Sequence, residues 1–343
     1  MNDLPNISIR VDGSMTPQAC VELAQAADEA GLAGVWFAEN AFARGILPAA
    51  AACAVATKRV QINAGVFNPY SRHPTMMAME IGALDELSDG RAAISIGAGI
   101  MSATEKMGLN ADKPLPALRD TLTILGGLLA GKEVEYLGQY FSAKKIKLDY
   151  AARREIPVYL AGRGNLTVGL AGEAASGLIV SNMCSAEFAG KVAALMRTSR
   201  SAAGRRSPGK VIQYMPAAVS RESSAAKDAA KRTIGEMLPR FWSLGQKLNS
   251  AKEALLAGTK ISEPEFASAA VRIRGGEDPA QVLDDRFATA FSVSGTAEEC
   301  LALARVYKAH GVDELALTFE GSTAKEQIKE IGETLMRLRG TAR

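Results

Sequence analysis

The stretch VQINAGVFNPYSRHPTMMAMEIGALDELSDGRAAISIGAG at 60–99 decides the fold. Its first apolar, β-branched run predicts a strand over Val60–Val66, and a second such run predicts a strand over Ala92–Ile96. Between them the proline and the periodic apolar residues of Pro74–Leu87 predict a helix, which ends at a turn of Ser, Asp and Gly. A strand, a helix and a second strand in this order form a crossover unit whose strands lie parallel.

The same alternation extends in both directions along the chain. Eight strands alternate with helices, and eight parallel strands that close on themselves make a (β/α)8 TIM barrel of the α/β class. An open, doubly wound sheet is the structural alternative, and the count of eight favours the barrel. The predicted strands are Ile7–Val11, Val35–Ala38, Val60–Val66, Ala92–Ile96, Pro157–Ala161, Leu178–Ser181, Val211–Val219 and Glu314–Thr318.

Two regions depart from this rhythm. Residues 133–150 resemble a small hairpin around Gly138, with strands over 133–138 and 139–142. Residues 222–288 have helical but irregular patterns. We therefore expect 1–343 to form one TIM-barrel domain that carries a hairpin insertion and a helical insertion. The predicted breaks in the helical insertion are Pro239, Pro264 and Pro279.

Composition excludes several classes of protein. The chain of 343 residues is 48% hydrophobic with a net charge of +3, and no block of Lys and Arg indicates nucleic-acid binding. Its four cysteines lack zinc-ligand and CxxC spacings, so neither a metal site nor a redox dithiol is expected. No apolar run reaches the ~18 residues that a membrane span needs. The N-terminus MNDLPNISIR has no signal-peptide pattern, so we expect a cytoplasmic protein.

The active site of a barrel lies at the carboxyl ends of its strands. The second strand ends at Glu39 and Asn40, and the third ends in the segment 63–70, which contains Asn68. Glu39 is the acid we assign to the site; the alternative is that it caps the next helix. Gly97 and Gly99 follow the fourth strand without the third glycine of a dinucleotide fingerprint, so they are better explained as leaving room for a ring.

The fifth strand runs into a glycine turn and then directly into a helix. In Gly162-Arg163-Gly164-Asn165 the glycines allow the backbone to approach a ligand closely. The helix N-terminus offers free N–H groups, and Arg163 adds a charge, which together suit an anion such as phosphate. A plain strand-to-helix turn that requires glycine is the alternative interpretation.

These segments resemble the luciferase-like family of flavin- or deazaflavin-dependent oxidoreductases. The likeness is greatest to the branch typified by methylenetetrahydromethanopterin reductase, which uses coenzyme F420. It covers nearly the whole chain except about 222–288. The segments that carry it are AGLAGVWFAEN at 30–40, GVFNPYSRHP at 65–74, LDELSDGR at 84–91, IGAG at 96–99, PVYLAG at 157–162, LAGE at 170–173 and GTAEE at 295–299.

The resemblance implies a TIM barrel with FMN or coenzyme F420 across its mouth. It implies that a bulge at the end of the third strand supports the ring, with a non-proline cis peptide that matches Gly65–Val66. It implies that the phosphate binds at 162–165. Relatives are commonly dimers, and the Ala-rich early helices suit a contact with a second copy of the chain, so a homodimer or higher homo-oligomer is expected.

Two positions depart from the family's pattern. The reductase branch carries a glutamate in the first strand, where this chain has Arg10; Asp12 points to the same barrel face and is a substitute for that acid or a turn residue. Many relatives have a histidine where this chain has Asn40, which hydrogen-bonds but does not exchange protons near neutral pH.

Three functions follow as hypotheses. The first is hydride transfer to or from a small organic substrate, with polar contacts from Glu39, Asn40, Arg10 and Asp12. The second is an FMN-dependent monooxygenase that is supplied by a separate flavin reductase. The third is a barrel without a cofactor that acts as a binding protein.

Overall fold

The computed structural model describes residues 3–153 and 155–340. Its main sheet contains eight parallel strands, which are β1 (Asn6–Asp12), β2 (Gly34–Ala38), β3 (Gln61–Phe67), β4 (Ala92–Ile96), β7 (Val158–Ala161), β8 (Gly177–Val180), β9 (Lys210–Val219) and β11 (Glu314–Phe319). Their hydrogen-bonded order is β9-β11-β1-β2-β3-β4-β7-β8, and β8 pairs again with β9. The strands thus form a closed ring, which confirms the predicted TIM barrel and excludes the open sheet.

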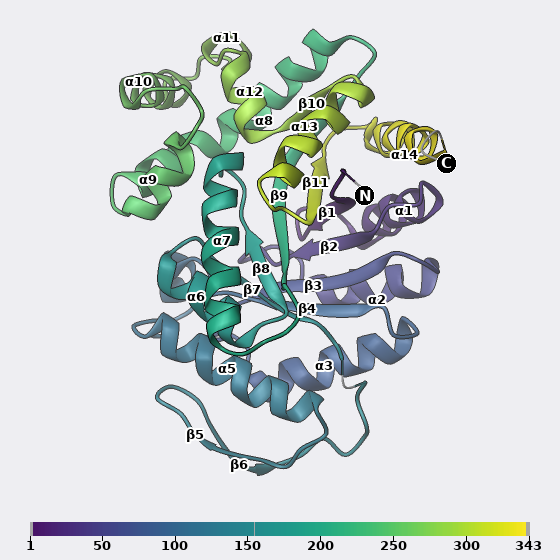
Figure 1. Cartoon of the computed structure of the whole chain (residues 1–343), viewed down its shortest axis with the longest axis vertical. Helices are drawn as coiled ribbons and strands as arrows, with labels where there is room; N and C mark the ends of the chain where they lie inside the picture. The colour runs from purple at the N-terminus through teal and green to yellow at the C-terminus, as the bar shows by residue number, and fades with distance from the viewer. Residues whose placement is uncertain (1–2, 154, 341–343) are drawn as a thin grey trace.

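Helices pack around this ring and cover its outer surface (Figure 1). The apolar layer between strands and helices is the largest core of the protein. Among the described residues, no helix combines the length and the apolar character that crossing a membrane requires. The helices are α1 (Pro17–Glu29), α2 (Ile46–Ala56), α3 (Pro74–Leu87), α4 (Met101–Lys106), α5 (Pro114–Leu129), α6 (Asn165–Ala174), α7 (Ala186–Ala202), α8 (Ser223–Gly245), α9 (Asn249–Leu256), α10 (Glu263–Arg274), α11 (Pro279–Val282), α12 (Asp285–Phe291), α13 (Ala297–Ala309) and α14 (Ala324–Gly340).

Local signals place several of these helices. The side chain of Thr16 accepts a hydrogen bond from the Ala19 N–H at 3.2 Å, and Pro17 follows as the first residue of α1, so cap and proline together fix the start of this helix. The chain after β4 contains the short helix α4. An additional short strand, β10 (Val293–Gly295), pairs with β9 outside the closed ring.

The region 133–150 contains an antiparallel hairpin of β5 (Val134–Leu137) and β6 (Ser142–Ile146), which lies outside α3 and α5 (Figure 1). Its second strand begins at Ser142, three residues later than predicted, because the residues before it form the turn.

The region 222–288 contains α8 to α11 and the start of α12, which gather at one end of the molecule around a second apolar cluster (Figure 1). The prediction that Pro239 breaks a helix is wrong, since α8 continues through it. Ile234 and Leu238 before the proline and Trp242 after it are all buried in this cluster, and their packing outweighs the local cost of proline. Pro264 and Pro279 lie in the first turns of α10 and α11, where proline is tolerated.

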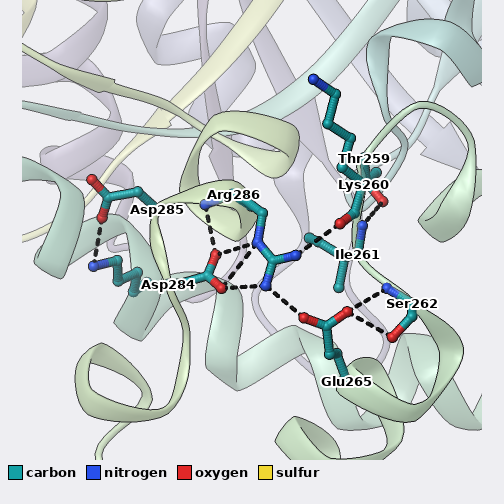
Figure 2. A network of polar contacts seen from close by, with 9 residues as sticks. Thr259, Lys260, Ile261, Ser262, Glu265, Asp284, Asp285 and Arg286 are labelled. Atoms are coloured by element: carbon teal, nitrogen blue, oxygen red, sulfur yellow. Dashed lines mark hydrogen bonds and ion pairs between the residues drawn. The ribbon is translucent and has the colours of Figure 1, made fainter.

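A network of polar contacts joins the last helices of this region (Figure 2). The Arg286 guanidinium donates to the carboxylates of Asp284 and Glu265, both at 2.6 Å, and to the carbonyl oxygen of Lys260 at 2.8 Å. Glu265 also accepts from the backbone N–H and the hydroxyl of Ser262, which completes a capping box at the start of α10. Arg286 therefore ties the start of α10 to the start of α12.

The barrel interior contains a buried charge below its aromatic layer. Glu314 is fully buried, and its carboxylate accepts hydrogen bonds from the Ser8 hydroxyl at 2.6 Å and the Trp36 indole N–H at 2.5 Å. Lys210, which is partly exposed, forms an ion pair with the same carboxylate. The Trp36 ring packs against Tyr159 and Tyr214, with centroids 5.4 and 6.0 Å away. The charge of Glu314 is thus compensated while it orients the side chain at the centre of the barrel.

We expect Lys210→Met to destabilise the protein by about 3 kcal/mol, because it leaves the Glu314 carboxylate buried without its cation. Urea unfolding of the variant and the parent measures this difference. Glu314→Gln is the matched control, since it keeps an acceptor for Trp36 and leaves only the partly exposed ammonium unpaired. If Lys210→Met lowers the free energy of unfolding by no more than Glu314→Gln does, this explanation is wrong.

Candidate active site

A cavity of about 290 Å³ opens at the carboxyl ends of β2, β3 and β4. Five of the predicted site residues line it, and its remaining walls are formed by the loop 41–45, by Ser71 and Arg72 after β3, and by α4 with the residues next to it. Several side chains at its edge are apolar and exposed, including Phe42, Ile100 and Met107. The predicted residues that line the cavity are Glu39, Asn40, Val66, Asn68 and Gly99.

The floor of the cavity is the end of β3. The peptide bond between Gly65 and Val66 is cis, which confirms the bond expected at this position. Gly65 has φ +132°, and a Cβ there would overlap the carbonyl and hydroxyl of Ser95 on β4, so glycine is required. A Cβ at Gly97 would collide with the side chain of Val66, so glycine at this predicted position leaves space for the bulge in β3.

Glu39 lies at the cavity wall with 22% of its side chain exposed. Burial raises the pKa of its carboxyl above the usual range; the Arg72 guanidinium, 3.6 Å away, opposes this shift and Glu80 reinforces it. Arg72 bonds more closely to Glu80, at 2.6 Å, and lies over the Phe67 ring at 4.5 Å. Glu39 is therefore an acid that retains its proton to a higher pH than an exposed glutamate does.

Arg10 and Asp12 do not line this cavity but lie together at the neighbouring end of β1. Their side chains are 3.4 Å apart, and Arg10 also donates to the Thr318 hydroxyl at 3.3 Å. Burial disfavours the charge on Asp12, but hydrogen bonds from Ser14, with smaller contributions from Arg10 and Asn40, hold the pKa of Asp12 below its usual range. Asp12 is thus an ionised hydrogen-bond acceptor near neutral pH.

The predicted phosphate loop lies on the far side of β4, at the end of β7. Gly164 is the N-cap of α6 and supplies no side-chain cap, and a Cβ there would meet no protein atom within 4 Å. The Arg163 guanidinium bonds to the Ser181 hydroxyl and lies over the Phe241 ring of α8 at 5.0 Å. Its second terminal nitrogen is buried and has no hydrogen-bond partner among the described residues. Uncapped helix N–H groups and an unsatisfied guanidinium nitrogen fit an anion.

Asn165 is the first residue of α6, and Gly162 packs against Thr167 within the same turn. The predicted residues therefore form three groups along the barrel mouth: the cavity at β2–β4, the charged pair on β1, and the turn after β7. Within the part of the chain that the structure describes, no group of three or more His, Cys, Asp and Glu side chains is arranged to hold a metal ion.

Three polar residues at the mouth, Arg72, Ser181 and Glu320, were not predicted to belong to the site. Arg72 faces Glu39, Ser181 binds Arg163, and Glu320 follows β11. Burial raises the pKa of Glu320; a hydrogen bond from Thr233 opposes this shift, while Glu236 and Asp12 reinforce it. The rule that active-site residues lie at the carboxyl ends of barrel strands could have identified Ser181 and Glu320, because both directly follow such strands. Arg72 lies in a loop, and no sequence pattern distinguished it.

A family model described as luciferase-like monooxygenase matches residues 5–314. The chain belongs to this family. It is therefore an oxidoreductase, as the resemblance implied, and the match spans strands β1 to β10 together with all three groups of site residues.

Relatives of this luciferase-like chain match either most of its length or less than half of it. A 5,10-methylenetetrahydromethanopterin reductase of Methanolobus tindarius is 24% identical over 317 residues, which cover 91% of this chain and 94% of the relative. An F420-dependent glucose-6-phosphate dehydrogenase of Microbacterium testaceum is 29% identical over 151 residues, 43% of this chain and 45% of the relative. The solved structure of coenzyme F420 dependent tetrahydromethanopterin reductase from Methanopyrus kandleri matches with a TM-score of 0.80 at 21% identity, over 98% of this chain and 99% of that one.

Proposed function

We propose that this luciferase-like protein is an F420-dependent oxidoreductase that transfers a hydride to or from a small organic substrate. The observation that carries the proposal is the cavity above the cis Gly65–Val66 bond, with the acid Glu39 in its wall. Two relatives support the deazaflavin: one matched over 91% of the chain is named as a reductase of a pterin, and one matched over 43% is named as an F420-dependent enzyme. FMN carries a similar tricyclic ring and a phosphate, and is the other cofactor that these residues suit.

In this proposal the ring lies against Val66 between the cavity and the turn at 162–165, and its phosphate is bound by the N–H groups of α6 and by Arg163. When bound, the deazaflavin or flavin supplies the hydride chemistry. The protein's own residues bind and orient the reactants. Glu39 holds a proton at its carboxyl oxygen beside the substrate, and Asn40 offers a hydrogen bond to a substrate carbonyl or hydroxyl.

A second candidate function is an FMN-dependent monooxygenase supplied by a separate flavin reductase. The observation that favours it is Arg10, which replaces the first-strand glutamate of the reductase branch and is held by Asp12 and Thr318. An arginine there holds a permanent positive charge and has no proton to exchange near neutral pH. Oxygen consumption coupled to substrate turnover would support the monooxygenase, whereas turnover in strictly anaerobic solution supports hydride transfer.

We expect the purified protein to bind F420, FMN or both at micromolar concentration, as measured by fluorescence titration. Arg163→Ala should weaken this binding about 10- to 100-fold, because a charge-assisted hydrogen bond contributes about 1.5–3 kcal/mol. Arg119→Ala removes the same charge from an exposed ion pair outside the mouth and serves as the control. A folded protein that binds neither cofactor would overturn the proposal and favour a barrel that acts as a binding protein.

Glu39→Gln should lower the turnover rate by about 10²–10⁴-fold, the usual contribution of a positioned proton donor, while cofactor affinity stays unchanged. The pKa of Glu39 is raised, and the protonated form is the active one. The parent therefore loses activity as the pH rises through that pKa, and the variant lacks this decline. Rate–pH profiles under saturating cofactor measure both effects. Equal rates for parent and variant at every pH would exclude Glu39 as the acid.

We further propose that two copies of this chain associate through the exposed faces of α2 and α3. Four large apolar side chains are exposed on these helices: Val55 is 70% exposed, and Met76, Met79 and Leu87 are each about half exposed. Val55→Lys or Met79→Lys should convert a dimer to a monomer in light scattering, because either change buries a charge in the interface. Val271→Lys, at a similarly exposed apolar position on α10, is the control. A parent protein that is monomeric at high concentration would contradict the proposal.

A further inference from the structure

The hairpin β5–β6 is anchored by one buried carboxylate. Asp120 on α5 is 2% exposed and accepts three hydrogen bonds: from the Tyr136 hydroxyl at 2.8 Å, the Tyr140 N–H at 2.6 Å and the Phe141 N–H at 2.9 Å. A Cβ at Gly138 would overlap this carboxylate, so the turn needs glycine there to approach α5. The tip of the hairpin is therefore fixed in position relative to the barrel.

Two aromatic side chains at the fixed tip contact residues that lie next to the cavity lining in the chain. The Tyr140 ring lies edge-on to Tyr70 with centroids 5.1 Å apart, and the Phe141 ring lies edge-on to His73 at 5.3 Å. The Tyr140 hydroxyl also donates to the carbonyl oxygen of Asn110 at 2.8 Å, in the segment that follows α4. The hairpin thus contacts both the chain after β3 and the chain after α4, and each of these segments lines the cavity.

Arg72 lies in the chain between the two residues that the hairpin contacts. From there its guanidinium reaches the Glu39 carboxylate at 3.6 Å and the Glu80 carboxylate at 2.6 Å. Only a quarter of the Arg72 side chain is exposed. Since Tyr70 and His73 flank Arg72, their contacts with Tyr140 and Phe141 limit where its backbone can lie.

We propose that the β5–β6 hairpin is a positioning element for the active site, in which Asp120 and Phe141 act through Tyr70 and His73 to hold Arg72 beside Glu39. This inference rests on the proposed function only for the role of Glu39 as an acid. The hairpin residues touch neither the cavity nor its reactants, so they are positioning residues.

The charges around Glu39 determine what a displaced Arg72 would change. Arg72 and Glu80 face Glu39 from the segment after β3 and from α3, and Arg44 lies in the loop on the other side of the cavity. On the adjacent strand β1, Asp12 and Arg10 pair with each other. The His73 ring is in contact with Phe141. Burial lowers the pKa of His73, so its imidazole is neutral at any pH above that lowered pKa. Arg72 lowers the pKa of Glu39, so a movement of Arg72 away from that carboxylate raises the pKa.

The test measures the titration of Glu39 directly, by carbon-13 NMR of selectively labelled glutamate carboxyls in the full-length protein, with Glu39→Gln to assign the signal. Arg72→Gln gives the shift expected when the guanidinium is removed. We expect Asp120→Asn and Phe141→Leu to move the Glu39 midpoint to higher pH, in the same direction as Arg72→Gln and by no more. Phe141→Leu keeps an apolar side chain at the contact, so it provides a readout if Asp120→Asn folds poorly. Leu137→Ala, at a residue 90% exposed on the same hairpin, should cause no shift.

A double variant distinguishes an effect of the hairpin on the position of Arg72 from a general loss of rigidity around the site. If the hairpin acts through Arg72, Phe141→Leu combined with Arg72→Gln gives the same Glu39 midpoint as Arg72→Gln alone. Unchanged midpoints in both hairpin variants, or additive shifts in the double variant, would overturn the inference. Full activity of Glu39→Gln would overturn the proposed role of Glu39 instead, and the NMR midpoints would still decide whether the hairpin holds Arg72.

Discussion

The carbonyl and hydroxyl of Ser95 occupy the space in which a side chain at position 65 would lie. β3 and β4 pair in register through Ala64 and Ile94, and they pair again only at Phe67 and Ile96, so the chain bulges between these two pairs. The close approach of the two strands therefore lies at the bulge itself, and the residue of the bulge that follows Gly65, Val66, lines the cavity. The segment that carries Arg72 starts from this bulge, so the geometry of the cavity depends on the tight contact between the two strands.

The sequence predicts the framework well because each element carries its own local signals. Thr16 and Pro17 identify the start of α1, and apolar runs locate each of the eight strands to within a few residues. Pro239 shows where local reasoning fails. Proline removes one helix hydrogen bond and disfavours the helical conformation before it, but the buried apolar residues on both sides of it, among them Trp242 stacked on Phe266, keep α8 continuous. That stabilisation comes from residues far away in the chain, which a local pattern does not contain.

Some site residues can likewise be predicted from local signals, while others depend on contacts between residues that are distant in the chain. Glu39, Asn40 and Gly99 follow barrel strands, and the rule that active sites lie at strand ends is sufficient to select them. Arg72 lies in a loop that precedes α3, and its importance arises from contacts with Glu39 and Glu80 that only the folded chain brings together. The role of the hairpin could not be predicted for the same reason, since no residue pattern in a short insertion indicates which loop it contacts.

Competition between two carboxylates for one guanidinium explains why Glu39 can hold a proton. Arg72 lies 2.6 Å from Glu80 and 3.6 Å from Glu39, so the closer carboxylate receives the stronger interaction. Had Arg72 been placed symmetrically, it would stabilise the charged form of Glu39 and oppose the effect of burial more strongly. The observed asymmetry leaves burial as the larger influence, and the acid stays protonated to a higher pH. The two distances, 3.6 and 2.6 Å, differ by 1.0 Å, so a movement of Arg72 of that size would change this balance. The aromatic tip of the hairpin contacts the residues on either side of Arg72, and under this inference those contacts keep the arginine at its unequal distances from the two carboxylates.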